Sequence, residues 1–219
     1  MYHALHKPTE LLVPVSAALA KTPSETWRAY GSHFRRHATA VISPELLAAL
    51  AQVESSANPL AQTYWRWQLT WHPFELYGPA SSAVGMYQIT DGTFAQTRRD
   101  CLNRPIAAGG DSMRAAGPCW FDALYTRVIP SRAVELTATL LDRAVAATLK
   151  RQRIASARLQ QKQDLAAVIH LCGAGTGDSY ARGGFRLSPG QRCGDHDVRA
   201  YLARVNGMKG VFARLALES

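Results

Sequence analysis

The chain has 219 residues, 47% of them hydrophobic and 19% charged, which is the composition of an ordinary globular protein. Its 25 Lys and Arg outnumber its 16 Asp and Glu, so the net charge is +9 and the surface favours anionic polymers such as nucleic acid, lipid headgroups or the bacterial cell wall. No apolar run is long enough for a transmembrane helix. Length and composition therefore predict one domain with a sizeable core, and charge alone does not choose among the polymers.

The N-terminal segment carries a weak export signal. The run LLVPVSAALA (residues 11–20) ends in an Ala-Leu-Ala triplet that resembles a signal-peptidase site. A proline inside the run and a glutamate before it make a poor signal peptide, so the sequence can equally be that of a mature form. We expect an exported protein with a leader or loosely attached segment over residues 1–22 and one domain over 23–219.

Apolar residues recur mostly at helical spacing, whereas strand-like alternation is scarce. The pattern predicts helices over 25–37, 44–54 and 91–99, and two more around the apolar stripes at 134–149 and 165–172. Turns rich in Gly and Pro separate them. The expected fold class is mainly α, with long loops.

Glu54 occupies an unusual place in the second predicted helix, which Ser43 caps. At about 100° per residue it falls at about 340°, between Leu50 and Leu47 on the apolar arc, whereas Gln52 marks the solvent side. Burial and the negative end of the helix dipole both disfavour its charge, so we expect a raised pKa and a carboxyl group that can donate a proton at about pH 6. The alternative is a glutamate that bends into solvent or pairs with an arginine.

An aromatic segment, TYWRWQLTWHPFELYGP (residues 63–79), follows this helix. Polar residues are interleaved with its rings, which include Trp65 and Trp67. Sugars stack on aromatic faces, so the segment is either a carbohydrate platform or part of the core, and the sequence leaves both open.

Three short motifs occur in order: ESSANPLA (54–61), SSAVGMYQIT (81–90) and HLCGAGTGD (170–178). Together they resemble the soluble lytic transglycosylase-like catalytic domain, a relative of goose-type lysozyme. The residues that carry this resemblance are Glu54, Ser55, Asn58 and Ala61, then Gly85, Met86 and Gln88 with Tyr87 in place of a methionine, then Ala174 and Gly175, and the late tyrosine Tyr201. The resemblance covers about residues 40 to 207.

The resemblance implies a lysozyme-like helical fold and cleavage of the MurNAc–GlcNAc bond of peptidoglycan without water or cofactor. A single carboxyl group, Glu54, would act as acid and base and leave 1,6-anhydromuramic ends. Gly85 and Gly175 would let the backbone approach the sugar. The full set of residues expected to bind substrate is Ser55, Gly85, Met86, Tyr87, Gln88, Ala174, Gly175, Tyr201, Trp65 and Trp67.

The same resemblance places the protein in the periplasm or elsewhere in the bacterial envelope. Its expected partner is the glycan strand, with an envelope-spanning secretion or conjugation machine as a further partner and no nucleic acid. The third motif departs from the family, because Cys172 and Gly173 replace a Tyr-Asn pair, and Tyr201 is expected to orient Glu54. A lysozyme-type hydrolase and a non-catalytic peptidoglycan-binding module therefore remain alternatives, and Asp91 is a second, weaker candidate acid.

The four cysteines form two sequence-local pairs. Two disulfides, Cys101–Cys119 and Cys172–Cys193, would account for all of them and would suit an oxidising compartment. The rival is a tetrahedral zinc site, whose ligands would be His170, Cys172, Cys193 and His196. We expect no bound metal, but the spacing of these cysteines and histidines alone does not exclude zinc.

Overall fold

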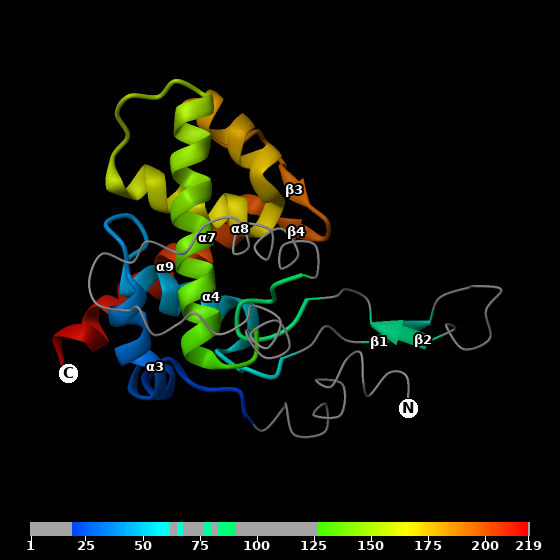
Figure 1. The fold of residues 1–219 in the computed structure, drawn as a ribbon. Coiled ribbons are helices and arrows are strands. Elements are labelled where there is room, and N and C mark those ends of the chain that lie inside the picture. The colour runs from blue at the N-terminus through cyan, green and yellow to red at the C-terminus, as the bar shows by residue number, and fades with distance from the viewer. Residues whose placement is uncertain (1–18, 62–64, 68–76, 80–82, 91–126, 219) are drawn as a thin grey trace, which may run out of the picture. The chain divides into compact units, whose positions relative to one another are not determined.

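The computed structural model describes residues 19–61, 65–67, 77–79, 83–90 and 127–218. Over these residues the fold consists of five α-helices and two short antiparallel strand pairs, so the mainly α prediction is confirmed (Figure 1). Cα proximity separates two compact units, one formed by 21–57 with 134–219 and the other by 1–20 with 58–133. The predicted helix at 91–99, Asp91 and the pair Cys101 and Cys119 lie outside the described residues.

The helices are α3 (Pro23–His37), α4 (Pro44–Ser55), α7 (Pro130–Arg151), α8 (Leu159–Arg182) and α9 (Val198–Leu217). The strands are β1 (Trp65–Trp67), which pairs with β2 (Tyr77–Pro79), and β3 (Arg192–Cys193), which pairs with β4 (His196–Asp197). None of the described helices is long and apolar enough to cross a bilayer.

The helix starts follow local side-chain chemistry. The Ser43 hydroxyl accepts a hydrogen bond from the Leu46 N–H at 3.3 Å, and Pro44 occupies the first helical position of α4, as predicted. Thr22 and Glu25 form a capping box at α3, in which the Glu25 carboxylate accepts from the Thr22 N–H at 2.8 Å. Each cap satisfies backbone donors that would otherwise be unpaired at the helix start.

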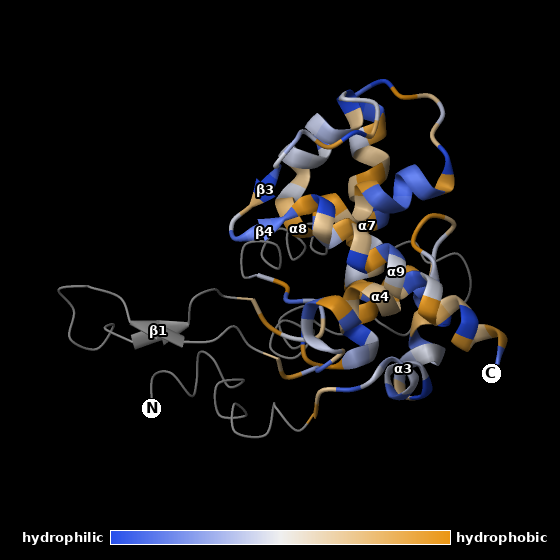
Figure 2. Ribbon diagram, turned by 180° about the vertical axis from the view of Figure 1, so that it is seen from behind, coloured by the Kyte–Doolittle hydropathy of each residue, from blue (hydrophilic) through white to orange (hydrophobic). Residues whose placement is uncertain are grey.

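Helix α4 lies at the centre of its unit. Its side chains from Leu46 to Ala51 are all buried, and it packs against α3 and α9. Figure 2 shows the contrast between this hydrophobic helix and the hydrophilic β3–β4 hairpin. The prediction that Gln52 marks a solvent face is wrong: its side chain accepts from the Thr26 hydroxyl at 2.7 Å and donates to the Lys21 carbonyl oxygen at 2.8 Å. Packing on several sides therefore replaces the amphipathic pattern expected for one exposed helix.

Helix α8 contains the whole third motif and bends within it. Gly173 adopts a φ of 81°, a left-handed conformation that favours glycine and interrupts the helical backbone. Beyond the bend, Gly177 lies so close to the Ile169 side chain that a Cβ would overlap it. The two halves of α8 thus pack against each other around the motif.

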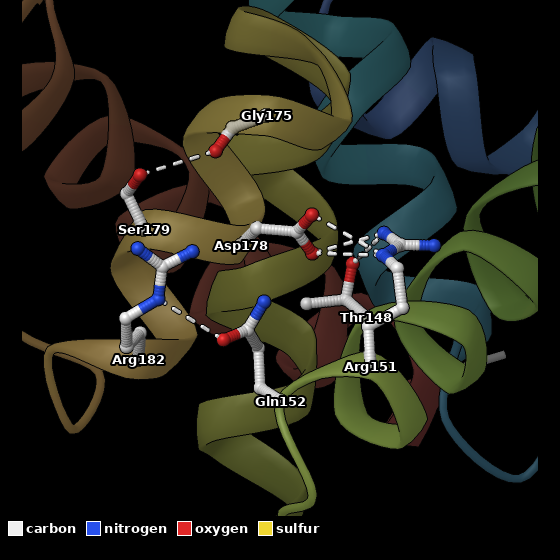
Figure 3. Close-up of polar contacts among 7 residues, drawn as sticks. All are labelled: Thr148, Arg151, Gln152, Gly175, Asp178, Ser179 and Arg182. Atoms are coloured by element: carbon white, nitrogen blue, oxygen red, sulfur yellow. Dashed lines mark hydrogen bonds and ion pairs between the residues drawn. The ribbon is translucent and has the colours of Figure 1, made fainter.

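Polar contacts join the end of α7 to the second half of α8 (Figure 3). Arg151 Nη2 lies 2.9 Å from Asp178 Oδ1 and Arg151 Nε lies 3.2 Å from Oδ2, an arrangement that holds the pKa of Asp178 below its usual value. Arg182 Nε donates to the Gln152 side-chain oxygen at 3.1 Å. Because Arg151 is largely exposed, we expect its ion pair to contribute less than about 1 kcal/mol to stability.

Candidate active site

Glu54 lies in the last turn of α4 and points into the unit formed by 21–57 and 134–219. Its side chain is only 17% exposed, so it neither bends freely into solvent nor pairs with an arginine among the described residues. The hydroxyl of Tyr201, in the first turn of α9, donates to Glu54 Oε1 at 2.6 Å. The expectation that Tyr201 contacts the candidate acid therefore agrees with the structure.

His170 is the second partner of the same oxygen. Its Nε2 lies 3.5 Å from Glu54 Oε1, and its side chain is 13% exposed. The sequence suggests His170 only as a zinc ligand, although two of its features indicate a different role. It begins the third motif, and it continues the apolar stripe of α8 that the structure buries from Leu165 to Ile169. That stripe is the face of α8 that the fold turns inward.

The pKa of Glu54 lies below its ordinary value, so the expected increase is wrong in direction. Burial does raise the pKa of Glu54, as expected, but the hydrogen bond and charge of His170, the Tyr201 hydroxyl and the charge of His196 together outweigh it. A helix pattern can predict burial, but it cannot predict donors that come from α8, α9 and β4. The free protein therefore favours the carboxylate form of Glu54 at neutral pH.

Tyr201 is built to remain a hydrogen-bond donor. Its side chain is 2% exposed, and burial together with the neighbouring Glu54 charge raises its pKa well above the usual value. Asp197 caps α9 by accepting from the Ala200 N–H at 2.7 Å, which sets the start of the helix one turn before Tyr201. The hydroxyl thus stays protonated and its helix is anchored.

Cys172 and Cys193 form a disulfide, as predicted, with their Cα atoms 5.5 Å apart. Their sulfurs are therefore not zinc ligands, and the described residues contain no group of three metal-binding side chains. The bridge ties α8, just beyond His170, to the β3–β4 hairpin that carries His196. The two histidines that lower the pKa of Glu54 are thus on covalently linked segments.

The second motif forms a tight turn in the other unit. Val84 and Ile89 exchange backbone hydrogen bonds of 3.2 and 3.1 Å, and between them Gln88 Nε2 donates to the Gly85 carbonyl oxygen at 2.9 Å and to that of Ala61 at 3.2 Å. The Gly85 N–H also donates to the Ala61 carbonyl at 2.8 Å. The structure therefore brings Ala61 of the first motif together with Gly85 and Gln88 of the second.

Two site residues of this turn are interior. Met86 and Tyr87 are 0% and 1% exposed, so their side chains pack inside the protein and only their backbone could contact a ligand. Gly85, at a φ of 83°, is required by the protein itself, because a Cβ would overlap the Arg127 carbonyl oxygen. Gly175 differs, since a Cβ there would meet no atom within 4 Å. Close approach to a sugar is thus not needed to explain Gly85.

The other residues expected at the site lie on three different parts of the chain. Ser55 Oγ donates to the Ala51 carbonyl at 3.4 Å, and Asn58 Oδ1 accepts from the Leu60 N–H at 2.9 Å. Ala174 and Gly175 lie exposed on α8, just after its bend. Trp65 and Trp67 belong to β1, opposite Pro79 and Tyr77 of β2, and their side chains lie outside the described part of the chain. The choice between platform and core for the aromatic segment therefore stays open.

Comparison with known proteins agrees with the motifs. The family model of the transglycosylase SLT domain matches residues 33–116, which include the Glu54 and Gln88 motifs. The third motif and Tyr201 lie beyond the matched residues, although they supply the contacts of Glu54. No curated protein matches the sequence. Residues 33–116 thus match the transglycosylase SLT domain, and the mainly α fold of the described residues is consistent with the lysozyme-like fold of such domains.

Proposed function

We propose that the protein is a lytic transglycosylase that cleaves the MurNAc–GlcNAc bond of peptidoglycan and uses Glu54 as its only acid and base. One observation carries the proposal: a mostly buried carboxyl group, in a chain with an SLT domain, receives a 2.6 Å hydrogen bond from a buried tyrosine. The domain itself supports peptidoglycan as the substrate class and an extracytoplasmic place of action.

In the first step, protonated Glu54 donates its proton to the glycosidic oxygen while the bond from that oxygen to C1 of the muramic acid breaks. In the second, the resulting carboxylate takes the proton of the C6 hydroxyl, whose oxygen forms the new bond to C1. The product is a 1,6-anhydro ring, no water is consumed and Glu54 regains its proton. One carboxyl group thus suffices, where ordinary glycosidases use two.

The lowered pKa of Glu54 must be reconciled with the acid role. A bound glycan would exclude water from the carboxyl group, and further desolvation raises the pKa of an acid. Substrate binding would thus move Glu54 toward the protonated form that the first step needs. The second step needs the opposite, a stable carboxylate, and the Tyr201 hydrogen bond supports that form.

Other residues keep supporting roles in the proposal. Ser55 follows the acid directly, and exposed Ala174 and Gly175 offer backbone to a sugar. The turn from Gly85 to Gln88 would contact substrate through its backbone, because the side chains of Met86 and Tyr87 are buried. Trp65 and Trp67 would stack on sugar rings.

We further propose that one catalytic domain spans 23–219, that residues 1–22 are a leader or a loosely attached segment, and that the protein acts in the periplasm or elsewhere in the cell envelope. The disulfide suits that oxidising compartment. Cleavage of glycan strands would serve local wall remodelling or would open a passage for an envelope-spanning machine.

The test is digestion of purified peptidoglycan by the wild type and by Glu54→Gln, with mass spectrometry of the released ends. We expect anhydro ends from the wild type. The rate of cleavage should fall roughly 10²-fold or more for Glu54→Gln, because a side-chain amide cannot donate a proton as a carboxylic acid does. Glu45→Gln, on the same helix, is the matched control and should keep activity. Reducing ends would instead identify a lysozyme-type hydrolase, glycan binding without cleavage would identify a binding module, and an active Glu54→Gln would remove Glu54 from the mechanism.

A further inference from the structure

The two oxygens of the Glu54 carboxyl group have different surroundings. Tyr201 Oη, at 2.6 Å, and His170 Nε2, at 3.5 Å, both approach Oε1. Among the described residues, no hydrogen bond or ion pair reaches Oε2. An oxygen that accepts a hydrogen bond from Tyr201 and has His170 Nε2 within ion-pair distance is a poor place for the acid's own proton, so the proton of the neutral form belongs on Oε2.

The position of His170 is fixed by the helix segment that carries it. Its half of α8 is buried from Leu165 to Ile169, and three residues after it the chain turns at Gly173. The Cys172–Cys193 disulfide fixes α8 to the β3–β4 hairpin next to that turn. A distance of 3.5 Å is longer than a normal hydrogen bond, but it is within ion-pair range and such contacts often tighten when substrate binds.

We propose that His170 is a positioning residue for Glu54, which, together with Tyr201, holds Oε1 and leaves Oε2 as the atom that gives and takes the proton. This inference rests on the proposed function and adds to it a histidine that lies outside the residues matched by the SLT family model. The imidazole acts only through Glu54 and contacts no reacting atom. In the second step, donation from Nε2 to Oε1 stabilises the carboxylate while Oε2 accepts the proton of the C6 hydroxyl.

A pH dependence follows from the charged and titratable groups around Glu54. These are His170 from α8, Tyr201 from α9 and His196 from β4, and Tyr201 stays neutral because burial and Glu54 raise its pKa. Burial raises the pKa of Glu54, and His170 opposes it both as a donor and as a charge. Activity needs the protonated acid and therefore falls as pH rises through this pKa. Removing His170 should raise the pKa and move that fall to higher pH.

The experiment compares His170→Leu, which has no donor, with His170→Gln, which keeps an amide donor but no charge. We expect kcat to fall roughly 10- to 100-fold for His170→Leu at unchanged KM, and His170→Gln to recover most of the loss. The alkaline limb of the pH profile should lie at higher pH in both variants than in the wild type. His33→Gln, on α3, is the control and should change neither quantity.

A second measurement does not depend on activity. Protein labelled with ¹³C at the glutamate carboxyl carbons is titrated by NMR, and the Glu54 resonance is identified by its absence in Glu54→Gln. We expect the midpoint of Glu54 to rise from wild type to His170→Gln to His170→Leu. If His170→Leu does not fold, the His170→Gln titration decides in its place.

The outcomes separate this inference from the proposed function. Unchanged kcat and an unchanged Glu54 midpoint in the His170 variants would overturn the role of His170, even where Glu54→Gln is inactive. An active Glu54→Gln would overturn the proposed function, whereas a shifted Glu54 midpoint would still establish the coupling to His170. A fall in kcat that His170→Gln does not rescue, with no change in the pH profile, would indicate a purely structural histidine and would also overturn the proposal.

Discussion

Glu54 and the turn from Gly85 to Gln88 both lie in motifs that the SLT family model covers, yet their surroundings are built in opposite ways. Glu54 meets side chains from two other helices, and its bond to Tyr201 joins residues 147 positions apart. Gln88 instead bonds backbone carbonyls, one of them only three residues before it. One region is an assembly of distant side chains and the other is a folded-over stretch of backbone.

The difference shows what each motif residue is for. Side chains at the Glu54 site carry protons, so substituting them should change chemistry more than folding. Residues of the turn satisfy backbone groups and fill space, so substituting them should change folding more than chemistry. The four predictions below test this division, from the largest expected effect to the smallest.

Gly85→Ala should be the most damaging single substitution for stability. A Cβ would overlap the Arg127 carbonyl oxygen at a backbone φ of 83°, and we expect a loss of about 3 kcal/mol from overlap and strain together. Gly175→Ala is the matched control, because its Cβ meets no atom within 4 Å and alanine favours the helix by up to about 1 kcal/mol. Urea denaturation measures both. Equal stability of the two variants would contradict the space-filling role of the turn.

The double variant Cys172→Ser, Cys193→Ser should lose about 3 kcal/mol of stability, as expected for opening a loop whose ends are 21 residues apart. Its activity should fall further than stability alone explains, because the bridge holds the segments of His170 and His196 beside Glu54. Denaturation curves and peptidoglycan digestion well below the unfolding transition measure the two effects. Full activity of the folded double variant would show that the Glu54 site does not need the bridge.

Tyr201→Phe should lower kcat by roughly 10- to 100-fold, because it removes the 2.6 Å bond that supports the carboxylate. The pKa of Glu54 should rise, since this hydroxyl helps to lower it. The pH at which activity falls should therefore be higher than in the wild type. Stability should change little, because the ring is kept. Wild-type kcat with an unchanged pH profile would remove Tyr201 from the mechanism.

Tyr87→Phe should have the smallest effect and the opposite sign. Its buried hydroxyl has no hydrogen-bond partner in the described structure, and burial raises its pKa well above the usual value. Removing an unpaired polar group should leave stability unchanged or raise it by up to about 1 kcal/mol. A clear loss of stability in thermal denaturation would show that the Tyr87 hydroxyl has a hydrogen-bond partner. The contrast between a bonded Tyr201 hydroxyl and an unbonded Tyr87 hydroxyl would then be wrong.

The features that the sequence predicted well depend on near neighbours. Capping at Ser43, the start of α4 at Pro44, the inward direction of Glu54 and the helical stripe of α8 are all set within a few residues. The wrong predictions involve distant partners. Gln52 falls on the solvent side of the helix pattern because nothing local reveals that α3 covers it. The pattern predicts a raised pKa for Glu54 because it shows burial but not the donors on other elements.

The sequence by itself thus determined a mainly α chain and the position of its one strong candidate acid, and it favoured, without deciding, the pairing of Cys172 with Cys193. Periodicity, caps and the short spacing of the cysteines act along the chain and can be read from it. Only the tertiary structure decided that His170 and Tyr201 share one oxygen of Glu54, and that their effect on its pKa exceeds that of burial. Hydrogen bonds and charges act over a few ångströms in space, and the fold alone sets which side chains come that close.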